Sequence, residues 1–127
     1  MAAAKGSMAA RGFALWRDAM RWQRNVDASL GPLRLTHTQY LVLFATDAVT
    51  EETRDAVTQR AIAEQAGLDE VTTSRVVRLL NERGFLERGG SSDRRAYRVT
   101  ITPKGRQTLR RATTDVEAAA KRFFAES

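Results

Sequence analysis

Apolar residues recur at the spacing of an α-helix along most of this 127-residue chain. The pattern predicts a helix over residues 11–30, whose apolar positions include Phe13, Trp16, Ala19, Met20, Val26 and Leu30. It predicts another helix of about twenty residues after Thr102-Pro103, an N-cap followed by a first-turn proline. Leu15 and Trp22 widen the first apolar stripe, and the last stripe continues past where a small domain could cover it. Both terminal helices therefore carry more apolar surface than one small core needs.

A second, mostly buried helix is predicted soon after the first. Gly31-Pro32 ends the first helix, and Thr36 is a typical N-cap for the next one. Residues 40–44 are all apolar, which is typical of a helix that lies inside a core. The acidic and polar residues 50–56 that follow predict a loop.

Two shorter helices in the middle of the chain are predicted to form a helix-turn-helix. Thr58 caps a short helix, which Gly67 ends. Asp69 then caps a longer helix, which ends at Gly84. Two helices joined by a glycine-containing turn of about three residues are the arrangement of this DNA-binding motif.

The second helix of this pair has two chemically different faces. Its core-facing positions, spaced at i, i+3, i+4 and i+7, are Thr73, Val76, Val77 and Leu80. Its outward positions are the candidate DNA-contacting residues Thr72, Ser74, Arg75 and Arg78. The N-terminal half of such a helix enters the major groove, and Arg75 is the best candidate for bidentate recognition of guanine. The alternative is that both arginines are solvated helix charges.

A β-hairpin is predicted directly after this motif. Residues 85–88 and 96–101 have strand character, and the second segment alternates apolar and polar positions. The stretch RGGSSDRRAYR between them holds the candidate DNA contacts Arg88, Ser91, Ser92, Asp93, Arg94, Arg95 and Arg98. Arginine gains from the negative potential of a narrow minor groove, so we expect Arg94 and Arg95 to insert there. We expect the arginines at the strand bases to contact the phosphate backbone, and Asp93 to orient Arg95 or form the turn. A hydrated, flexible turn is the alternative.

The net charge of +6 is concentrated in the middle of the chain. Residues 58–111 hold twelve Lys/Arg and six Asp/Glu, an excess of +6, whereas residues 1–57 sum to +1 and residues 112–127 to −1. An excess confined to one segment is expected where one face of a protein meets a polyanion. The charge pattern therefore favours nucleic-acid binding over a general gain in solubility.

The composition excludes several other classes of protein. The chain has no cysteine, which excludes disulfides, thiolate metal sites and thiol redox sensing. No apolar run approaches the ~20 residues that a membrane span needs, so we expect no membrane partner. The opening MAAAKGSMAARG lacks the apolar region of a secretory signal, and a cytoplasmic location is the default expectation. Residues 1–10 are interpreted as a flexible N-terminus that includes a tag remnant.

The sequence contains little that indicates a catalytic or cofactor-binding site. His37 is the only histidine, and neither a nucleophile–base pair nor a glycine-rich phosphate loop is present, so we expect no enzyme activity, cofactor or metal. A candidate effector pocket between the first two helices would be lined by Trp16, Trp22, His37, Tyr40 and Phe44. Aromatic residues at helical spacing are more often core or dimer seam, which is the alternative interpretation.

From about Trp16 to Phe124 the chain resembles the MarR family of bacterial transcription regulators. The resemblance is carried by Leu35-Thr36 with Gln39-Tyr40, the run from Thr73 to Gly84, Asp93 with Arg95, and Val99-Thr100-Ile101-Thr102-Pro103 with Gly105. It implies an obligate homodimer held by the terminal helices, a pseudo-palindromic operator in double-stranded DNA, a recognition helix in the major groove and a wing in the minor groove. In many members a small aromatic or phenolic molecule releases the DNA. Members usually continue into a further C-terminal helix. Either the chain is truncated before that helix, or the protein is a short variant whose dimer interface rests more on the first and last helices.

We therefore expect a mainly α fold with a small β-hairpin, in which a winged helix-turn-helix domain is flanked by N- and C-terminal dimerisation helices. Residues 11–127 would form one domain, with 11–35 and 106–127 as dimerisation helices and 36–105 as the DNA-binding lobe. The expected function is that of a sequence-specific, homodimeric transcriptional repressor that a small aromatic ligand relieves. Two alternatives stay open: a winged-helix protein-interaction module without specific DNA recognition, and a DNA binder without an effector.

Overall fold

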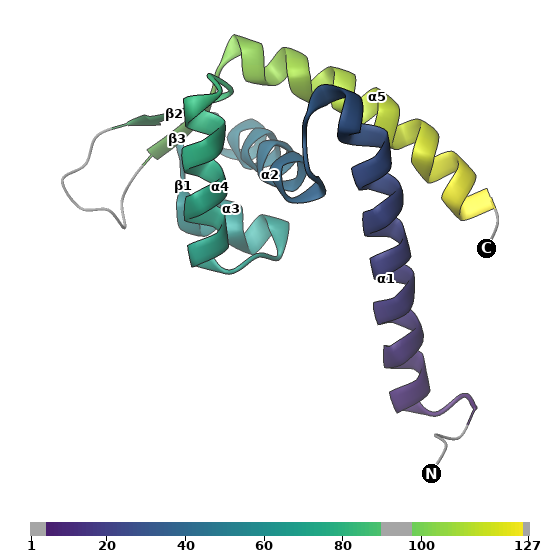
Figure 1. Ribbon diagram of the computed structural model, residues 1–127. Helices are drawn as coiled ribbons and strands as arrows, with labels where there is room; N and C mark the ends of the chain where they lie inside the picture. Colours follow the sequence, from purple (N-terminus) through teal and green to yellow (C-terminus); the bar gives the residue numbers. More distant parts are fainter. Residues whose placement is uncertain (1–4, 90–97, 126–127) are drawn as a thin grey trace.

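The computed structural model describes residues 5–89 and 98–125, which form a set of helices with one small sheet (Figure 1). In chain order the elements are α1 (Met8–Leu30), the short 3₁₀ helix η1 (Gly31–Leu33), α2 (His37–Thr53), β1 (Val57–Thr58), α3 (Gln59–Ala66), α4 (Glu70–Glu82), β2 (Leu86–Gly89), β3 (Arg98–Ile101) and α5 (Pro103–Ala125). The predicted fold class, a winged helix-turn-helix between two long terminal helices, is confirmed.

Side-chain caps set the points at which the helices begin. The four predicted N-caps each accept a hydrogen bond from a first-turn backbone N–H, at 3.1, 3.1, 2.7 and 3.0 Å for Thr36, Thr58, Asp69 and Thr102. Thr36 forms a full capping box, because Gln39 Oε1 accepts a hydrogen bond from the Thr36 N–H at 3.2 Å. Gly67 ends α3 with a φ of 72°, a left-handed conformation that glycine adopts without steric cost.

Helix α2 is longer than the sequence predicts. A loop was expected from residue 50, but α2 continues to Thr53 and ends at Arg54, which has a φ of 56°. The hydroxyls of Thr50 and Thr53 donate to backbone carbonyls one turn earlier, at 2.7 and 3.0 Å. Threonine hydroxyls can bond either within a helix or to a turn, so a polar composition alone does not distinguish the two.

One further boundary and one strand differ from the prediction. Helix α1 begins at Met8, because the Ser7 hydroxyl accepts a hydrogen bond from the Ala10 N–H at 3.1 Å and caps the helix. Residues 8–10 are therefore helical, although they fall within the segment predicted as a flexible N-terminus. The sequence also does not predict β1, since two residues are too few to show an alternating pattern.

The sheet has three antiparallel strands in the order β1-β3-β2, so β1 extends the expected hairpin by one strand. In β3 the central residue is Val99, which lies opposite both Val57 of β1 and Arg88 of β2. Val99 and Leu86 are fully buried. One face of the sheet therefore closes one side of the core (Figure 1).

The core lies among α2, α3, α4 and the inner face of the sheet, with contributions from the end of α1 and from α5. Its largest fully buried side chains are Leu30, Leu43, Ile62, Leu80 and Leu86. Helix α5 begins beside the sheet, where Gly105 lies so close to the segment between α4 and β2 that a β-carbon would overlap the carbonyl oxygen of Phe85. The absence of a side chain at Gly105 thus fixes how closely α5 approaches the helix-turn-helix.

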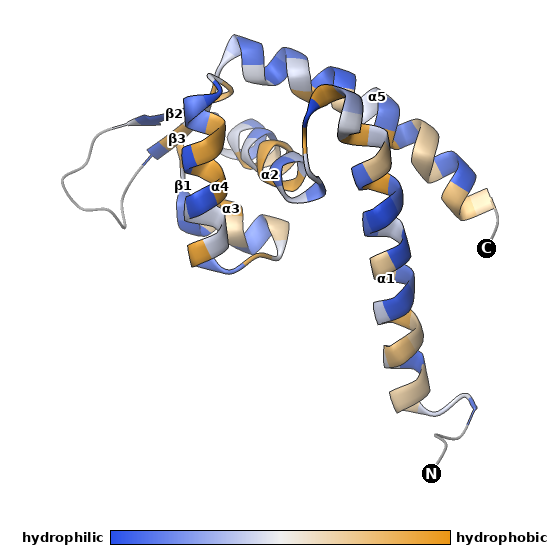
Figure 2. Ribbon diagram, viewed as in Figure 1, coloured by the Kyte–Doolittle hydropathy of each residue, from blue (hydrophilic) through white to orange (hydrophobic). Residues whose placement is uncertain are grey.

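The two terminal helices meet away from this lobe (Figure 1). Trp22 of α1 packs against Phe123 and Phe124 of α5, with ring centroids 5.4 and 5.7 Å apart. On α1 the buried residues are Val26 and Leu30, in its last two turns. The earlier part of α1 extends away from the rest of the chain with apolar residues along it (Figure 2).

Candidate nucleic-acid interface

Helix α4 buries one side and exposes the other, as the sequence predicts. Thr73, Val76, Val77 and Leu80 are buried. The Thr73 hydroxyl donates to the Asp69 carbonyl at 2.8 Å, so its burial leaves no unpaired donor. Arg75 and Arg78 are exposed, and Ser74 is partly exposed on the same side. These three predicted recognition residues therefore project from the lobe.

Thr72, the fourth predicted recognition residue, is engaged in the cap of α4. Its backbone N–H donates to Asp69 Oδ1 at 2.7 Å, and its hydroxyl donates to Asp69 Oδ2 at 2.9 Å. These two hydrogen bonds lower the pKa of Asp69 from its ordinary value of 3.8, because they favour the ionised carboxylate. The Thr72 hydroxyl therefore holds the first turn of α4 in place, and its proton is not directed outward.

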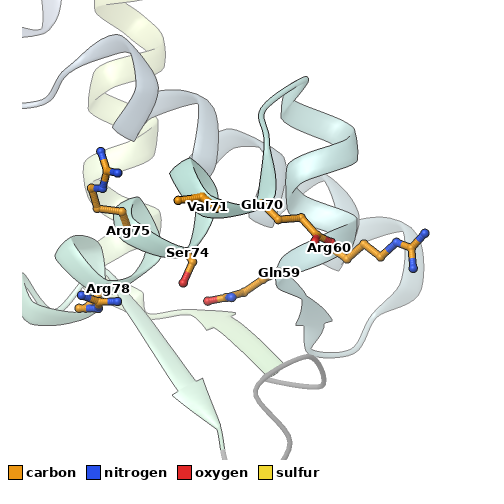
Figure 3. A pocket seen from close by; sticks show the side chains of 7 residues that line it. All are labelled: Gln59, Arg60, Glu70, Val71, Ser74, Arg75 and Arg78. Atoms are coloured by element: carbon orange, nitrogen blue, oxygen red, sulfur yellow. The ribbon is translucent and has the colours of Figure 1, made fainter.

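An open cavity of about 640 Å³ lies between the first turn of α3 and the outward face of α4 (Figure 3). It is lined by Gln59, Arg60, Glu70, Val71, Ser74, Arg75 and Arg78. Three of these residues are arginines and one is a glutamate, so the lining has a net positive charge. The cavity joins the three outward recognition residues to the start of the preceding helix in one surface.

Four residues of this lining were not singled out from the sequence. Gln59 and Arg60 follow the Thr58 cap, and Glu70 and Val71 follow the Asp69 cap. The available signal was that the two helices of a helix-turn-helix pack against each other, so exposed residues of both can share a surface. Gln59 reaches toward Ser74 (Figure 3), and among the described residues its buried Oε1 atom has no hydrogen-bond partner.

The far end of α4 is anchored to the segment between α1 and α2. Arg83 Nη1 donates to the Arg34 carbonyl at 2.7 Å, and Nη2 donates to the Leu33 carbonyl at 3.3 Å. The same guanidinium lies over the Phe85 ring, 4.7 Å from its centroid. Lys104 Nζ donates to the Arg83 carbonyl at 3.1 Å. The position of α4 is thus coupled to the segment that follows α1 and to the start of α5.

The predicted wing contacts are only partly within the described residues. Ser91, Ser92, Asp93, Arg94 and Arg95 lie outside them. Arg88 pairs with Val99, and Arg98 pairs with Gly89 in the neighbouring register position. Because successive side chains point to opposite faces of a strand, Arg88 shares the side of the buried Val99, whereas Arg98 points to the other side. The two arginines therefore do not form one basic patch.

The five candidate effector-pocket residues are divided between separate contacts. Trp22 belongs to the aromatic cluster with the end of α5, and Trp16 is 63% exposed. Tyr40 lies 5.9 Å from Phe44, centroid to centroid, and its hydroxyl shares a 3.2 Å hydrogen bond with Thr113 of α5. Burial raises the pKa of Tyr40.

His37 begins α2 and is fixed through its backbone. Its N–H donates to Asp27 Oδ1 at 2.7 Å, which ties the start of α2 to α1. Partial burial lowers the pKa of His37, and the Asp27 carboxylate acts in the opposite direction.

Within residues 5–89 and 98–125, no group of three or more metal-binding side chains is placed to hold an ion. Over the same residues, no helix has the length and apolar character to cross a membrane.

A second cavity, of about 420 Å³, lies at the start of α5. It is lined by Ile101, Pro103, Arg106, Gln107 and Arg110. Arg106 Nε lies 3.6 Å from Asp47 Oδ1, an ion pair that connects α5 to α2. Neither this cavity nor the one beside α4 is lined by any of the five candidate effector residues.

Comparison with known proteins gives a consistent result. A family model described as MarR family matches residues 35–96, which include the helix-turn-helix. The HTH-type transcriptional regulator YdcH of Bacillus subtilis (strain 168) is 32% identical over 115 residues, which are 90% of this chain and 78% of that protein.

Solved structures show the same likeness over nearly the whole chain. A MarR-family transcriptional regulator from Rhodococcus sp. RHA1 is 30% identical, with a TM-score of 0.79 and coverage of 94% of this chain and 83% of that one. CouR from Rhodococcus jostii RHA1, bound to p-coumaroyl-CoA, is 33% identical, with a TM-score of 0.76 and coverage of 90% and 78%. The helix-turn-helix, the sheet and these likenesses agree: the chain belongs to the MarR family of transcriptional regulators.

Proposed function

We propose that this regulator is a homodimeric repressor that binds a pseudo-palindromic DNA operator, with α4 of each subunit in the major groove. The observation that carries the proposal is the outward face of α4, where Ser74, Arg75 and Arg78 border an open, cationic cavity. A helix of this kind, placed second in a helix-turn-helix, fits the major groove with its N-terminal residues at the base edges.

The arginines of α4 suit two different tasks. A planar guanidinium can donate two hydrogen bonds to O6 and N7 of guanine, and Arg75 lies nearer the N-terminal end that reaches deepest. Arg78 lies about one turn further along and suits a phosphate contact. Arg60 of α3 pairs through Nε with Glu64 at 3.5 Å and has its side chain 76% exposed. It suits a contact to the DNA phosphate backbone beside α4.

The homodimer is supported by apolar surface on the terminal helices. On the terminal helices, the large apolar side chains that are more than half exposed are Met8, Phe13, Leu15 and Trp16 of α1, and Phe124 of α5. Several large apolar side chains exposed along one helix favour a protein contact, because monomers seldom leave large apolar patches in water. We therefore propose that residues 11–35 and 106–127 form the dimer interface and residues 36–105 the DNA-binding lobe.

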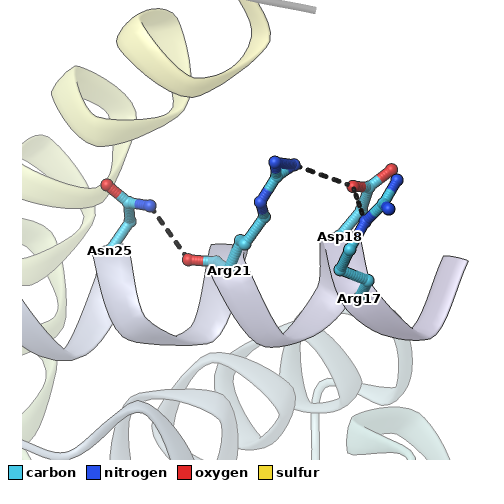
Figure 4. Close-up of polar contacts among 4 residues, drawn as sticks. All are labelled: Arg17, Asp18, Arg21 and Asn25. Atoms are coloured by element: carbon cyan, nitrogen blue, oxygen red, sulfur yellow. Dashed lines mark hydrogen bonds and ion pairs between the residues drawn. The ribbon is translucent and has the colours of Figure 1, made fainter. Parts of the chain in front are cut away.

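The other side of α1 is polar. Asp18 Oδ1 lies 3.3 Å from Arg21 Nη1 and 4.0 Å from Arg17 Nε, and Asn25 Nδ2 donates to the Arg21 carbonyl at 2.9 Å (Figure 4). Exposed ion pairs of this type contribute little to stability. They keep one side of the helix hydrated, so α1 offers one apolar side to a partner and one polar side to solvent.

We propose an aromatic effector because of the similarity to one solved structure, CouR. CouR, at 33% identity, was solved with p-coumaroyl-CoA. In this chain Phe44 is 48% exposed beside the buried Tyr40, between the DNA-binding lobe and α5. An aromatic ring that stacks on Phe44 would lie where α2 and α5 meet, and would act on α4 through those helices.

The proposal is tested by selecting bound duplexes from random DNA with the full chain, followed by footprinting. We expect an inverted repeat whose half-site centres are about 34–36 Å apart, one helical turn, and an affinity that falls steeply with salt. A double substitution, Arg75→Ala with Arg78→Ala, should abolish the footprint. Arg21→Ala, which removes an arginine from the polar side of α1, is the matched control and should leave the footprint intact.

Weak binding without sequence preference would contradict the proposal. It would instead favour a winged-helix module that uses its basic surface to bind an acidic protein. Repression is tested separately by a reporter gene behind the selected operator, whose expression should fall when the protein is present.

A further inference from the structure

Val71 is a large apolar side chain in the middle of a polar, cationic surface. It lies in the first turn of α4, is 71% exposed, and borders the cavity together with Ser74 and Arg75 (Figure 3). Successive residues of a helix are about 100° apart, so Val71 shares its side of α4 with the residues at i+4 and i+7, Arg75 and Arg78. It lies at the centre of the outward face, opposite the fully buried Leu80.

The fold does not account for a valine at this position. Val71 is not among the buried or partly buried residues that make up the core. A β-branched side chain also has a lower helix propensity than alanine or an unbranched side chain, so it does not favour the first turn of α4. The cap of this helix is supplied by Asp69 and Thr72, without any contribution from the Val71 side chain. Within the described residues, the Val71 side chain therefore has no role in the core or in the cap of α4.

We infer that Val71 is a specificity-determining residue that contacts the 5-methyl group of a thymine in the major groove. The inference rests on the proposed function and deepens it. Thymine is the base that presents an apolar group in the major groove, whereas the other base edges present hydrogen-bond donors and acceptors that an isopropyl group cannot satisfy. Val71 has no polar side-chain atom, so this methyl group is the base feature that complements it.

The position of the thymine follows from the helix geometry. Val71 and Arg75 are four residues apart, or roughly 6 Å along the axis of α4. That distance is close to two base-pair steps of about 3.4 Å. The thymine should therefore lie within about two base pairs of the guanine that Arg75 contacts, in each half-site of the operator.

The test removes one thymine methyl group at a time from the operator DNA. Duplexes carrying the selected operator are prepared with deoxyuridine in place of each thymidine in turn, which removes the 5-methyl group and keeps the base pair. The affinity of the full chain is measured for each duplex at one fixed salt concentration. We expect a loss of about fourfold per half-site at a single position, the value for burial of one methyl group.

The protein side of the test is Val71→Ala. This variant should bind the thymine and uracil duplexes equally at that position, while the wild type discriminates between them. Leu79→Ala is the matched control. Leu79 is also an apolar residue of α4 and is 41% exposed, but it lies in the C-terminal half of the helix. The Leu79→Ala variant should retain the discrimination of the wild type.

The test distinguishes failure of the proposed function from failure of the inference about Val71. If the wild type selects no duplex sequence at all, the proposed function fails and the inference with it. If the wild type selects an operator but no thymine-to-uracil change weakens binding, the inference alone is wrong. Discrimination that persists in Val71→Ala would also overturn the inference, because the methyl group would then be read by another residue.

Discussion

Two helical faces of this protein are similarly exposed but differ in chemistry. The N-terminal part of α1 exposes Phe13, Leu15 and Trp16, at 65, 73 and 63%. The outward face of α4 exposes two arginines around one valine. Apolar surface is stabilised by another apolar surface, whereas a cationic surface is stabilised by an anion that releases its counterions. We therefore expect different partners for the two faces: another apolar surface for α1 and an anionic surface for α4.

The largest expected effect comes from charging the exposed face of α1. In a Leu15→Glu, Trp16→Glu double variant the dimer should dissociate, and operator affinity should fall by about 100-fold or more, because the two half-sites are then no longer bound together. Light scattering measures the mass, and titration of operator DNA measures the affinity. Arg21→Ala, on the polar side of α1, should stay dimeric; a double variant that also stays dimeric would contradict the proposed interface.

The next prediction compares the stability effects of substitutions on the buried and outward sides of α4. Leu80→Ala should lower the free energy of unfolding by about 2–5 kcal/mol, because it leaves a cavity in the core. Val71→Ala should change the free energy of unfolding by less than about 0.5 kcal/mol, since its side chain is mostly in solvent. Urea denaturation of both variants measures the difference. Equal losses would show that the outward face of α4 is packed against another part of the protein.

A smaller effect concerns the recognition face itself. Arg75→Lys keeps the positive charge but loses the planar fork, so discrimination between guanine and other bases at one operator position should drop by about 1–3 kcal/mol. Binding to non-specific DNA and the mass of the dimer should not change. The measurement is the ratio of affinities for operators that differ at that base pair. An unchanged ratio would mean that Arg75 contacts phosphate only.

The smallest effect is a pH dependence at the cap of α4. The pKa of Asp69 is lowered in the folded protein by the hydrogen bonds from Thr72, so its contribution to stability is present above the ordinary pKa of 3.8 and is lost as the pH falls through the lower folded value. Asp69→Asn should retain a cap at neutral pH and remove this part of the acid dependence. Denaturation midpoints at pH 7 and pH 3 test the difference. Identical acid dependence in both proteins would contradict the assignment.

The sequence predicted most of the helix-turn-helix correctly, for identifiable reasons. The caps at Thr36, Thr58 and Asp69 and the glycine at position 67 are local signals, in which a side chain and its partner lie within a few residues. The buried and exposed sides of α4 follow from its period alone. Caps and helical periodicity can be read from the sequence because they depend only on residues that are close together in the chain.

The features that the sequence missed depend on distant contacts or on short segments. Strand β1 exists because Val57 pairs with Val99, far away in the chain. Gln59 and Val71 share a surface because α3 and α4 begin at neighbouring points in space. The candidate effector residues, grouped by helical spacing, instead divide between the cluster of Trp22 with α5 and the pair of Tyr40 with Phe44.

The sequence by itself determined the order and type of the main helices, the confinement of positive charge to the middle of the chain and the resemblance that placed it in its family. The tertiary structure alone decided that α3 and α4 form one cavity, that Arg88 and Arg98 face opposite sides of the sheet, and that Val71 stands at the centre of the outward face of α4 without a role in the core. The physical reason is that local patterns set the dihedral angles and amphipathic faces of each element. Which faces meet, and which residues stay in water, is settled only when all the elements compete to bury their apolar surface together.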